Sequence, residues 1–209
     1  MESTIWSFKR GATLLLRDSL PAPSPLPTQL QPFDPSTPFL PESEHITEIN
    51  HRDQVYERVG PYIFHFAAGS FFQNNNSILI PLTEYVKEAI STTLPKPTHL
   101  VDTYCGSGLF GITLSDQFER VAGVEISSDS IKAAKVNAEM NGLGEKTEWL
   151  CGKAEDIFGG LPEQGFEGGK SCVVVDVSLI SSSSSLHVSL HNPKTTSRSS
   201  IASGHLPTI

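Results

Sequence analysis

The residues best suited to chemistry lie in one short stretch, residues 100–111, which read L-V-D-T-Y-C-G-S-G-L-F-G. An apolar run followed by closely spaced glycines predicts a buried strand, a tight turn and the start of a helix. In a parallel α/β sheet, nucleotide-like ligands bind at such a junction, outside the carboxyl ends of the strands. Glycine permits the backbone angles of the turn and lets a ligand approach the backbone. The free N–H groups at the helix start would face that ligand.

Two classes of cofactor fit this turn. Gly106, Gly108 and Gly111 satisfy G-x-G-x-x-G, which is typical of dinucleotide binding, and Glu125 follows at a distance suited to a ribose. The alternative is S-adenosylmethionine, whose methyltransferases often carry an acidic residue in the strand before the turn, here Asp102. Backbone amides bind a carboxylate or a phosphate, and a carboxylate binds ribose hydroxyls. The turn alone therefore leaves both cofactors open.

A second motif upstream favours the methyl donor. Residues 66–76 read F-A-A-G-S-F-F-Q-N-N-N, and V-A-G-V-E-I-S follows the glycine turn. In this order the motifs resemble the RNA 5-methyluridine methyltransferases, and most closely the fungal tRNA (uracil-5-)-methyltransferases. The resemblance covers roughly residues 46–176, and residues 6–17 also resemble a stretch of those enzymes. It implies S-adenosylmethionine as the cofactor and an RNA, tRNA or another, as the substrate. A nicotinamide-dependent oxidoreductase has no place for the A-G-S-F-F-Q-N-N motif.

The reaction that the resemblance implies is methyl transfer to carbon 5 of a uracil, which is a poor nucleophile. In this family a cysteine thiolate adds to carbon 6 and makes carbon 5 enolate-like. Carbon 5 then attacks the sulfonium methyl group, and a base removes the carbon 5 proton so that the cysteine is released. The uridine must be flipped out of its stack to be reached.

The predicted cofactor site consists of seven residues: Gln73, Asp102, Tyr104, Gly106, Gly108, Glu125 and Asp176. The resemblance places the cofactor contacts of the family on four of them, Gln73, Tyr104, Glu125 and Asp176. The resemblance implies that Glu125 accepts hydrogen bonds from ribose hydroxyls, whereas Asp102 orients the turn. Each assignment has a plainer alternative. Gln73 would cap the following helix, Tyr104 would pack in the core, and Glu125 would be an exposed acid at a strand end.

The residues that would activate the uracil are missing from this sequence. The family continues after its strand-four aspartate as D-P-P-R-x-G, but Asp176 is followed by V-S-L-I-S, and no S-C-N-x-x-T motif occurs. Ser171 and Cys172 resemble the start of that motif but precede Asp176, so we interpret Cys172 as a buried strand residue. We therefore expect no catalytic residue and no turnover by the chain alone.

The abrupt loss of similarity after Asp176 is what a frameshift, a misread splice site or a C-terminal truncation would produce. The alternative is a chain that never catalyses the reaction by itself. It would be a non-catalytic module that binds S-adenosylmethionine, or a subunit whose partner supplies the missing half.

Composition limits which classes of binding partner and compartment remain. A net charge of −8 argues against binding nucleic acid through the bulk field of the chain, so RNA binding would need a local basic patch or a separate domain. Three cysteines without a C-x-x-C pair favour a reducing, intracellular compartment. The histidines show no metal-ligand spacing, so we expect no metal. No apolar run approaches the ~20 residues that span a bilayer, so we expect no membrane partner.

The expected fold is α/β, with the Rossmann-like sheet of the class I S-adenosylmethionine-dependent methyltransferases. Periodicity predicts strands at 99–104, 121–126, 147–151 and 171–176, and helices at 76–93, 108–118 and 129–140. We expect the sheet to be incomplete after its fourth strand. That strand would then present an apolar, unpaired edge, which favours aggregation and marginal stability.

Composition and pattern divide the chain into five segments. Residues 1–20 would be a remnant of a central β domain, 21–45 a proline-rich linker or loop, 46–68 a small β meander, 69–176 a partial methyltransferase domain, and 177–209 a serine-rich disordered tail.

Overall fold

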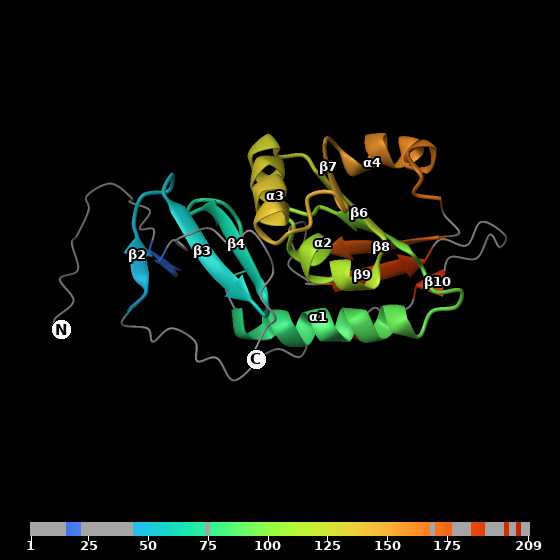
Figure 1. Ribbon diagram of the computed structural model, residues 1–209, viewed down its shortest axis with the longest axis horizontal. Coiled ribbons are helices and arrows are strands. Elements are labelled where there is room, and N and C mark those ends of the chain that lie inside the picture. Colours follow the sequence, from blue (N-terminus) through green and yellow to red (C-terminus); the bar gives the residue numbers. More distant parts are fainter. Residues whose placement is uncertain are drawn as a thin grey trace.

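The computed structural model describes residues 16–21, 44–73, 76–167 and 170–176, and the strand backbones of residues 185–190, 199–200 and 204–205. These residues form one large sheet covered by helices and two two-stranded sheets beside it (Figure 1). The parts of segments 1–20, 21–45 and 177–209 outside these ranges lie beyond the described residues, and the domain boundaries stay predictions.

Four parallel strands form one side of the large sheet, which ends at β7: β5 (His99–Thr103), β6 (Arg120–Glu125), β7 (Thr147–Cys151) and β8 (Ser171–Asp176). Their order is β8-β5-β6-β7, with every neighbouring pair parallel. The α/β prediction is confirmed, and the predicted strand positions agree to within one residue. This order places the carboxyl end of β5 between those of β6 and β8, where ligands bind in open α/β sheets.

The prediction that the fourth strand is an unpaired edge is wrong. The strand β9 (Ser185–Leu190) pairs antiparallel with β8, in a register that runs from Cys172 opposite Leu190 to Asp176 opposite Leu186. Two short strands, β10 (Ser199–Ser200) and β11 (Gly204–His205), pair with β9. The expected disorder of the tail is therefore wrong for these strands. The segment is rich in serine, but within residues 185–190 apolar residues alternate with others, as is typical of a strand. A strand placed beside β8 can satisfy the open N–H and C=O groups of β8.

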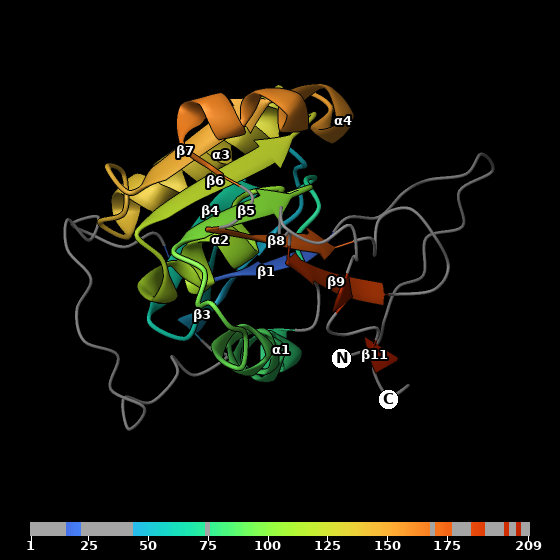
Figure 2. The same ribbon diagram turned by 90° about the vertical axis from the view of Figure 1, so that its right-hand side faces the viewer.

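Helices cover both faces of the large sheet. One face carries α1 (Asn76–Ser91), α2 (Leu109–Thr113) and α3 (Ser128–Met140), and the other carries α4 (Ala154–Ile157) with the 3₁₀ helices η3 (Phe158–Gly160) and η4 (Pro162–Gln164). Figure 2 shows α1 and α4 on opposite sides of the molecule. Along β5, Leu100 packs toward α1 while Val101 packs toward Leu161, because successive strand residues point to opposite faces.

The helix after the glycine turn is shorter than predicted. It ends at Thr113, and the 3₁₀ helix η2 (Ser115–Gln117) follows it, where the sequence predicted one helix over 108–118. In α1, Leu79, Val86 and Ile90 lie at helical spacing, and all three are buried.

The expected three-stranded meander is wrong in its pairing. The strands β3 (Gln54–Val59) and β4 (Tyr62–Ala67) form a hairpin, but β2 (Ile46–Glu48) pairs with β1 (Arg17–Ser19) instead of with β3. The segment after β1 lies beside β3, where the Leu20 N–H donates to the Tyr56 carbonyl oxygen at 2.9 Å. Leu20, which precedes β2 in the chain, therefore occupies the position beside β3 that was expected for β2.

The hairpin packs against α3 through a shared apolar core. Phe64 and Phe66 of β4 are buried in the same cluster as Ala134 of α3. Phe72 stacks on Phe66 with ring centroids 4.3 Å apart, which anchors the F-F-Q segment. The upstream motif is thus held beside the large sheet, as Figure 1 shows for the hairpin and α3.

Candidate functional site

The turn between β5 and α2 has a backbone conformation that few residue types adopt. Tyr104, Gly106 and Gly108 have φ angles of 60°, 53° and 94°, all in the left-handed region. For a residue with a side chain such a conformation costs about 1–3 kcal/mol and is typical of functional sites. The Gly108 N–H donates to the Cys105 carbonyl oxygen at 2.8 Å and closes the turn.

Asp102 holds this turn against its strand. Its side chain is buried in β5, and its Oδ2 accepts a hydrogen bond from the Gly111 N–H at 2.8 Å. The carboxylate thereby ties the first turn of α2 back to the strand that precedes it. This contact gives Asp102 an orienting position in the turn.

Glu125 faces the turn from the end of β6. Its Oε2 accepts a hydrogen bond from the Gly106 N–H at 3.2 Å, and its Oε1 accepts one from the Ser127 N–H at 2.9 Å. A carboxylate has about four lone-pair sites. With two of them used by backbone amides, Glu125 retains the capacity to accept hydrogen bonds from two ligand hydroxyls.

The glycines of the motif are required for different reasons. A Cβ added at Gly106 would meet no heavy atom within 4 Å, so this glycine borders open space. A Cβ at Gly108 would lie 2.8 Å from the Trp149 ring, and one at Gly111 would lie 3.0 Å from it. The open space at Gly106 suits a ligand, whereas Gly108 and Gly111 leave room for Trp149. This packing role of Trp149 is a feature that motif reading missed.

The remaining predicted site residues are Tyr104, Asp176 and Gln73. Tyr104 is partly buried at the start of the turn. Asp176 is the last residue of β8, one position beyond Val175, which lies opposite Thr103 of β5. Gln73 follows the buried Phe72, whose carbonyl oxygen accepts a hydrogen bond from Arg17 at 3.4 Å. Direct hydrogen bonds link the turn to Glu125 and, within it, Gly111 to Asp102.

Two of the three cysteines are buried, and the third is exposed at the end of a strand. Burial raises the pKa of Cys105 well above its usual range, and the nearby Asp102 and Glu125 carboxylates raise it further. Burial raises the pKa of Cys172 to about 12, in agreement with its interpretation as a buried strand residue. Cys151 is exposed at the end of β7. Because the thiolate is the nucleophilic form, Cys105 and Cys172 are poorly suited to attack a uracil.

A cavity of about 580 Å³ lies between the hairpin and α3. Arg52, His65 and Phe71 line it on the hairpin side, and Lys132 lines it from α3. Ser107 of the glycine turn also lies on its wall, so the cavity adjoins the turn. Sequence reasoning missed this cavity because its residues come from segments far apart in the chain.

The described residues contain no group of three or more His, Cys, Asp or Glu side chains that could hold a metal ion. None of the helices in the described part of the chain is long and apolar enough to cross a bilayer.

Comparisons with known proteins give the same assignment as the motifs. The family model "tRNA (Uracil-5-)-methyltransferase" matches residues 44–148, which is half of the chain. A second model, "RNA cap guanine-N2 methyltransferase", matches residues 97–201. The two models overlap in the glycine turn and the strands around it, whereas the hairpin and the F-F-Q segment are matched by the first model.

Two yeast proteins are similar over most of the chain. The tRNA (uracil(54)-C(5))-methyltransferase of Schizosaccharomyces pombe is 38% identical over 166 residues, 77% of this chain, and that of Saccharomyces cerevisiae is 37% identical over 190 residues, 75% of this chain. The chain spans 28% of the length of each.

One solved structure, the Pyrococcus abyssi tRNA (uracil-54, C5)-methyltransferase in complex with S-adenosyl-L-homocysteine, is 24% identical with a TM-score of 0.41. It covers 51% of this chain and 25% of its own. On the family match, with the motifs and the parallel sheet, this chain belongs to the tRNA (uracil-5-)-methyltransferase family.

Proposed function

We propose that this chain binds S-adenosylmethionine at the glycine turn and provides the cofactor half of a tRNA uracil-5-methyltransferase. The observation that carries this proposal is the Glu125 carboxylate, which lies opposite Gly106 and has lone pairs left for two hydroxyls. The open space at Gly106 supports it, because a ligand can approach the backbone there. When bound, the cofactor supplies a methyl group on a sulfonium ion.

The residues of the chain would bind and orient this cofactor. Glu125 would accept hydrogen bonds from the ribose hydroxyls, and Asp102 would keep the turn in place through the Gly111 N–H. Gln73, Tyr104 and Asp176 are proposed contacts around the same turn, assigned from the family pattern. These contacts hold the cofactor without moving a proton or forming a covalent bond.

We further propose that a chain of this sequence does not methylate uracil by itself. No S-C-N-x-x-T motif is present in its 209 residues. Burial raises the pKa of Cys105 and Cys172, which disfavours the thiolate that would attack carbon 6. The chain would therefore act as a binding module, or would need a partner that supplies the nucleophile.

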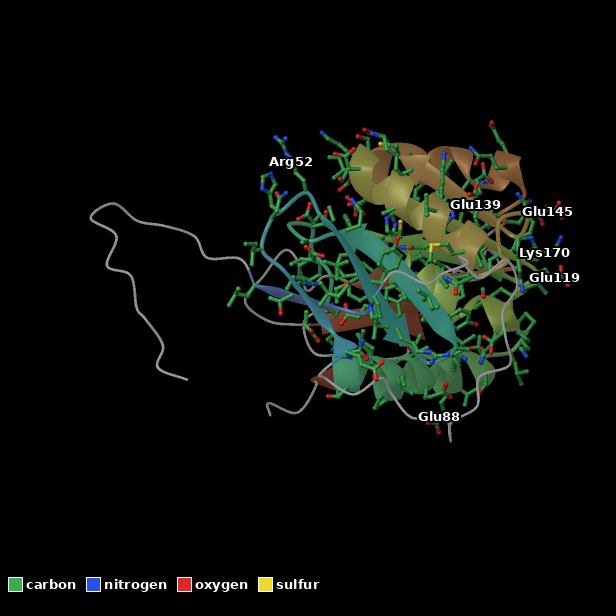
Figure 3. The ribbon with its side chains drawn as sticks, turned by 60° about the vertical axis from the view of Figure 1, so that its left-hand side comes forward. Arg52, Glu88, Glu119, Glu139, Glu145 and Lys170 are labelled. Atoms are coloured by element: carbon green, nitrogen blue, oxygen red, sulfur yellow. The ribbon has the colours of Figure 1, made fainter. Side chains whose placement is uncertain are left out.

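Calorimetric titration with S-adenosylhomocysteine tests the cofactor proposal. We expect saturable binding by the unmodified chain and a dissociation constant at least about tenfold higher for Glu125→Ala, since a charged hydrogen-bond acceptor is lost. Glu119→Ala is the matched control, because Glu119 immediately precedes β6 at the end opposite Glu125. In Figure 3, Glu119, Glu145 and Lys170 are labelled on the same side of the molecule.

Two outcomes would contradict the cofactor proposal, and a third would contradict the proposed lack of turnover. Equal binding by Glu125→Ala and the unmodified chain would remove Glu125 from the site. Binding of NAD in place of the homocysteine derivative would assign the turn to a dinucleotide. Transfer of a labelled methyl group to uridine in tRNA by the purified chain would show that a nucleophile is present after all.

A further inference from the structure

The edge of β4 that faces α3 is closed by two buried asparagine side chains. Asn137 and Asn141 are 0% and 2% exposed. The Asn137 Oδ1 accepts a hydrogen bond from the His65 N–H at 2.7 Å, and the Asn141 Oδ1 accepts one from the Ile63 N–H at 3.0 Å. Figure 1 shows α3 alongside the hairpin.

The spacing of these asparagines matches the strand. Four residues along an α-helix rise about 6 Å, and two residues along a strand rise about 6.8 Å. One asparagine per helical turn therefore meets every second residue of β4. A carboxamide has both an acceptor and donors, so it can replace the peptide group of a missing neighbouring strand.

The two asparagines differ in their second hydrogen bond. The Asn137 Nδ2 donates to the Ser107 carbonyl oxygen at 2.9 Å, inside the glycine turn. The Asn141 Nδ2 donates to the Ile63 and Asn137 carbonyl oxygens, both at 2.8 Å, and so contacts only β4 and α3 itself. Asn137 thus links the hairpin to the turn, and Asn141 links the hairpin to α3.

We propose that Asn137 is a positioning residue for the cofactor site, an inference that rests on the proposed function. Its amide holds the Ser107 peptide, which lies between the two left-handed glycines Gly106 and Gly108. The Gly106 N–H that donates to Glu125 belongs to the same turn. Because the other end of the carboxamide is fixed to β4, the hairpin sets the orientation of the turn that receives the ligand.

The variants Asn137→Asp and Asn141→Asp separate this role from ordinary packing. Each keeps an acceptor for the β4 amide and loses the donor, so each places a carboxylate oxygen against a carbonyl oxygen. We expect both to lower the unfolding midpoint in urea. We expect the dissociation constant for S-adenosylhomocysteine to rise at least about tenfold in Asn137→Asp and to change less than about threefold in Asn141→Asp.

A measurement on the unmodified chain covers the case in which Asn137→Asp does not fold. If Asn137 couples the turn to β4, ligand binding must stabilise the hydrogen bond that it accepts from β4, since coupling is reciprocal. S-adenosylhomocysteine should then slow amide exchange at His65 more than at Ile63.

Equal affinities of the two variants, or equal slowing of the two amides, would overturn the inference and leave the proposed function intact. Absence of binding by the unmodified chain would overturn the proposed function and the inference with it.

Discussion

Single residues in and beside the glycine turn are constrained by one aromatic ring, that of Trp149. Trp149 is buried and lies against Gly108, Gly111 and Gly123. A Cβ added at Gly123 would lie 2.2 Å from the Trp149 Cε3 atom, and a Cβ at Gly106 would meet nothing. The glycines near the turn therefore differ in their surroundings: Gly108, Gly111 and Gly123 leave room for Trp149, whereas Gly106 borders open space, where we propose that the ligand approaches.

We expect Gly123→Ala to lower the free energy of unfolding by about 3 kcal/mol, because the new methyl group overlaps a ring that cannot move freely. We expect Gly106→Ala to cost only about 1 kcal/mol, from its left-handed backbone, and to weaken cofactor binding. Urea denaturation measures both. In the double variant Gly123→Ala/Trp149→Leu most of the effect of the alanine should disappear, and the contact of the new methyl group with Cys105 Sγ, at 2.9 Å, should leave a smaller remainder. If the alanine costs as much beside leucine as beside tryptophan, the steric explanation is wrong.

His65 provides a pH-dependent contribution to stability. Burial lowers the pKa of His65 from its ordinary value of 6.5, and its Nδ1 atom is buried without a hydrogen-bond partner among the described residues. As the pH falls below 6.5, the unfolded chain takes up this proton before the folded chain does. The stability is therefore complete above that pH and decreases as the pH falls through the folded-state pKa.

The variant His65→Gln should reduce this acid sensitivity. We expect its urea midpoint to change less between about pH 7.5 and about pH 5.5 than that of the unmodified chain. Some loss should remain, because burial also lowers the pKa of His99, with the charge of Arg120 adding to the effect. An equal change of midpoint in both chains would exclude His65 as a contributor.

At the scale of elements, the unexpected feature is the place of β8. It lies between β5 and β9 and is an inner strand, although the sequence after Asp176 departs from the family pattern. Pairing on both sides removes the open edge on which the expectation of aggregation rested. The apolar run Val173-Val174-Val175 suits this position, because an inner strand covered on its faces is apolar throughout.

Amide exchange distinguishes an inner β8 from an edge strand. In an inner strand every N–H group is hydrogen-bonded, so the amides of Val173, Val174 and Val175 should all exchange slowly. In an edge strand every second N–H group faces solvent. Alternating fast and slow exchange along these three residues would therefore contradict the pairing with β9.

At the scale of the whole molecule, the chain carries a net charge of −8, so any RNA binding must rest on local cations. Arg52 lines the cavity beside the glycine turn, together with Phe71, which is 56% exposed, and with Lys132, whose ammonium group is paired with the Asp129 carboxylate at 2.8 Å. Cations that contact phosphates and an aromatic face that stacks on a base are the usual means of binding RNA. In Figure 3, Arg52 and Lys170 lie at opposite sides of the molecule.

If tRNA approaches along this cavity, Arg52→Gln should weaken tRNA binding about three- to tenfold and reduce its dependence on salt by about one phosphate contact. Lys170→Gln removes the same charge at the distant end and should leave both unchanged. Filter binding at several salt concentrations measures the two effects. Equal losses in both variants would mean that net charge, and not the cavity, governs the association.

The sequence by itself determined the parallel strands, the glycine turn, the approximate positions of the helices and the family. These features are encoded by residue periodicity and by motif spacing, which are local properties of the chain. Only the tertiary structure decided that β9 covers β8, that Trp149 requires Gly123, and that Asn137 joins the hairpin to the turn. Each of these features depends on side chains or strand edges that come from different segments of the chain. The residue pattern within one segment does not show which other segment it will contact.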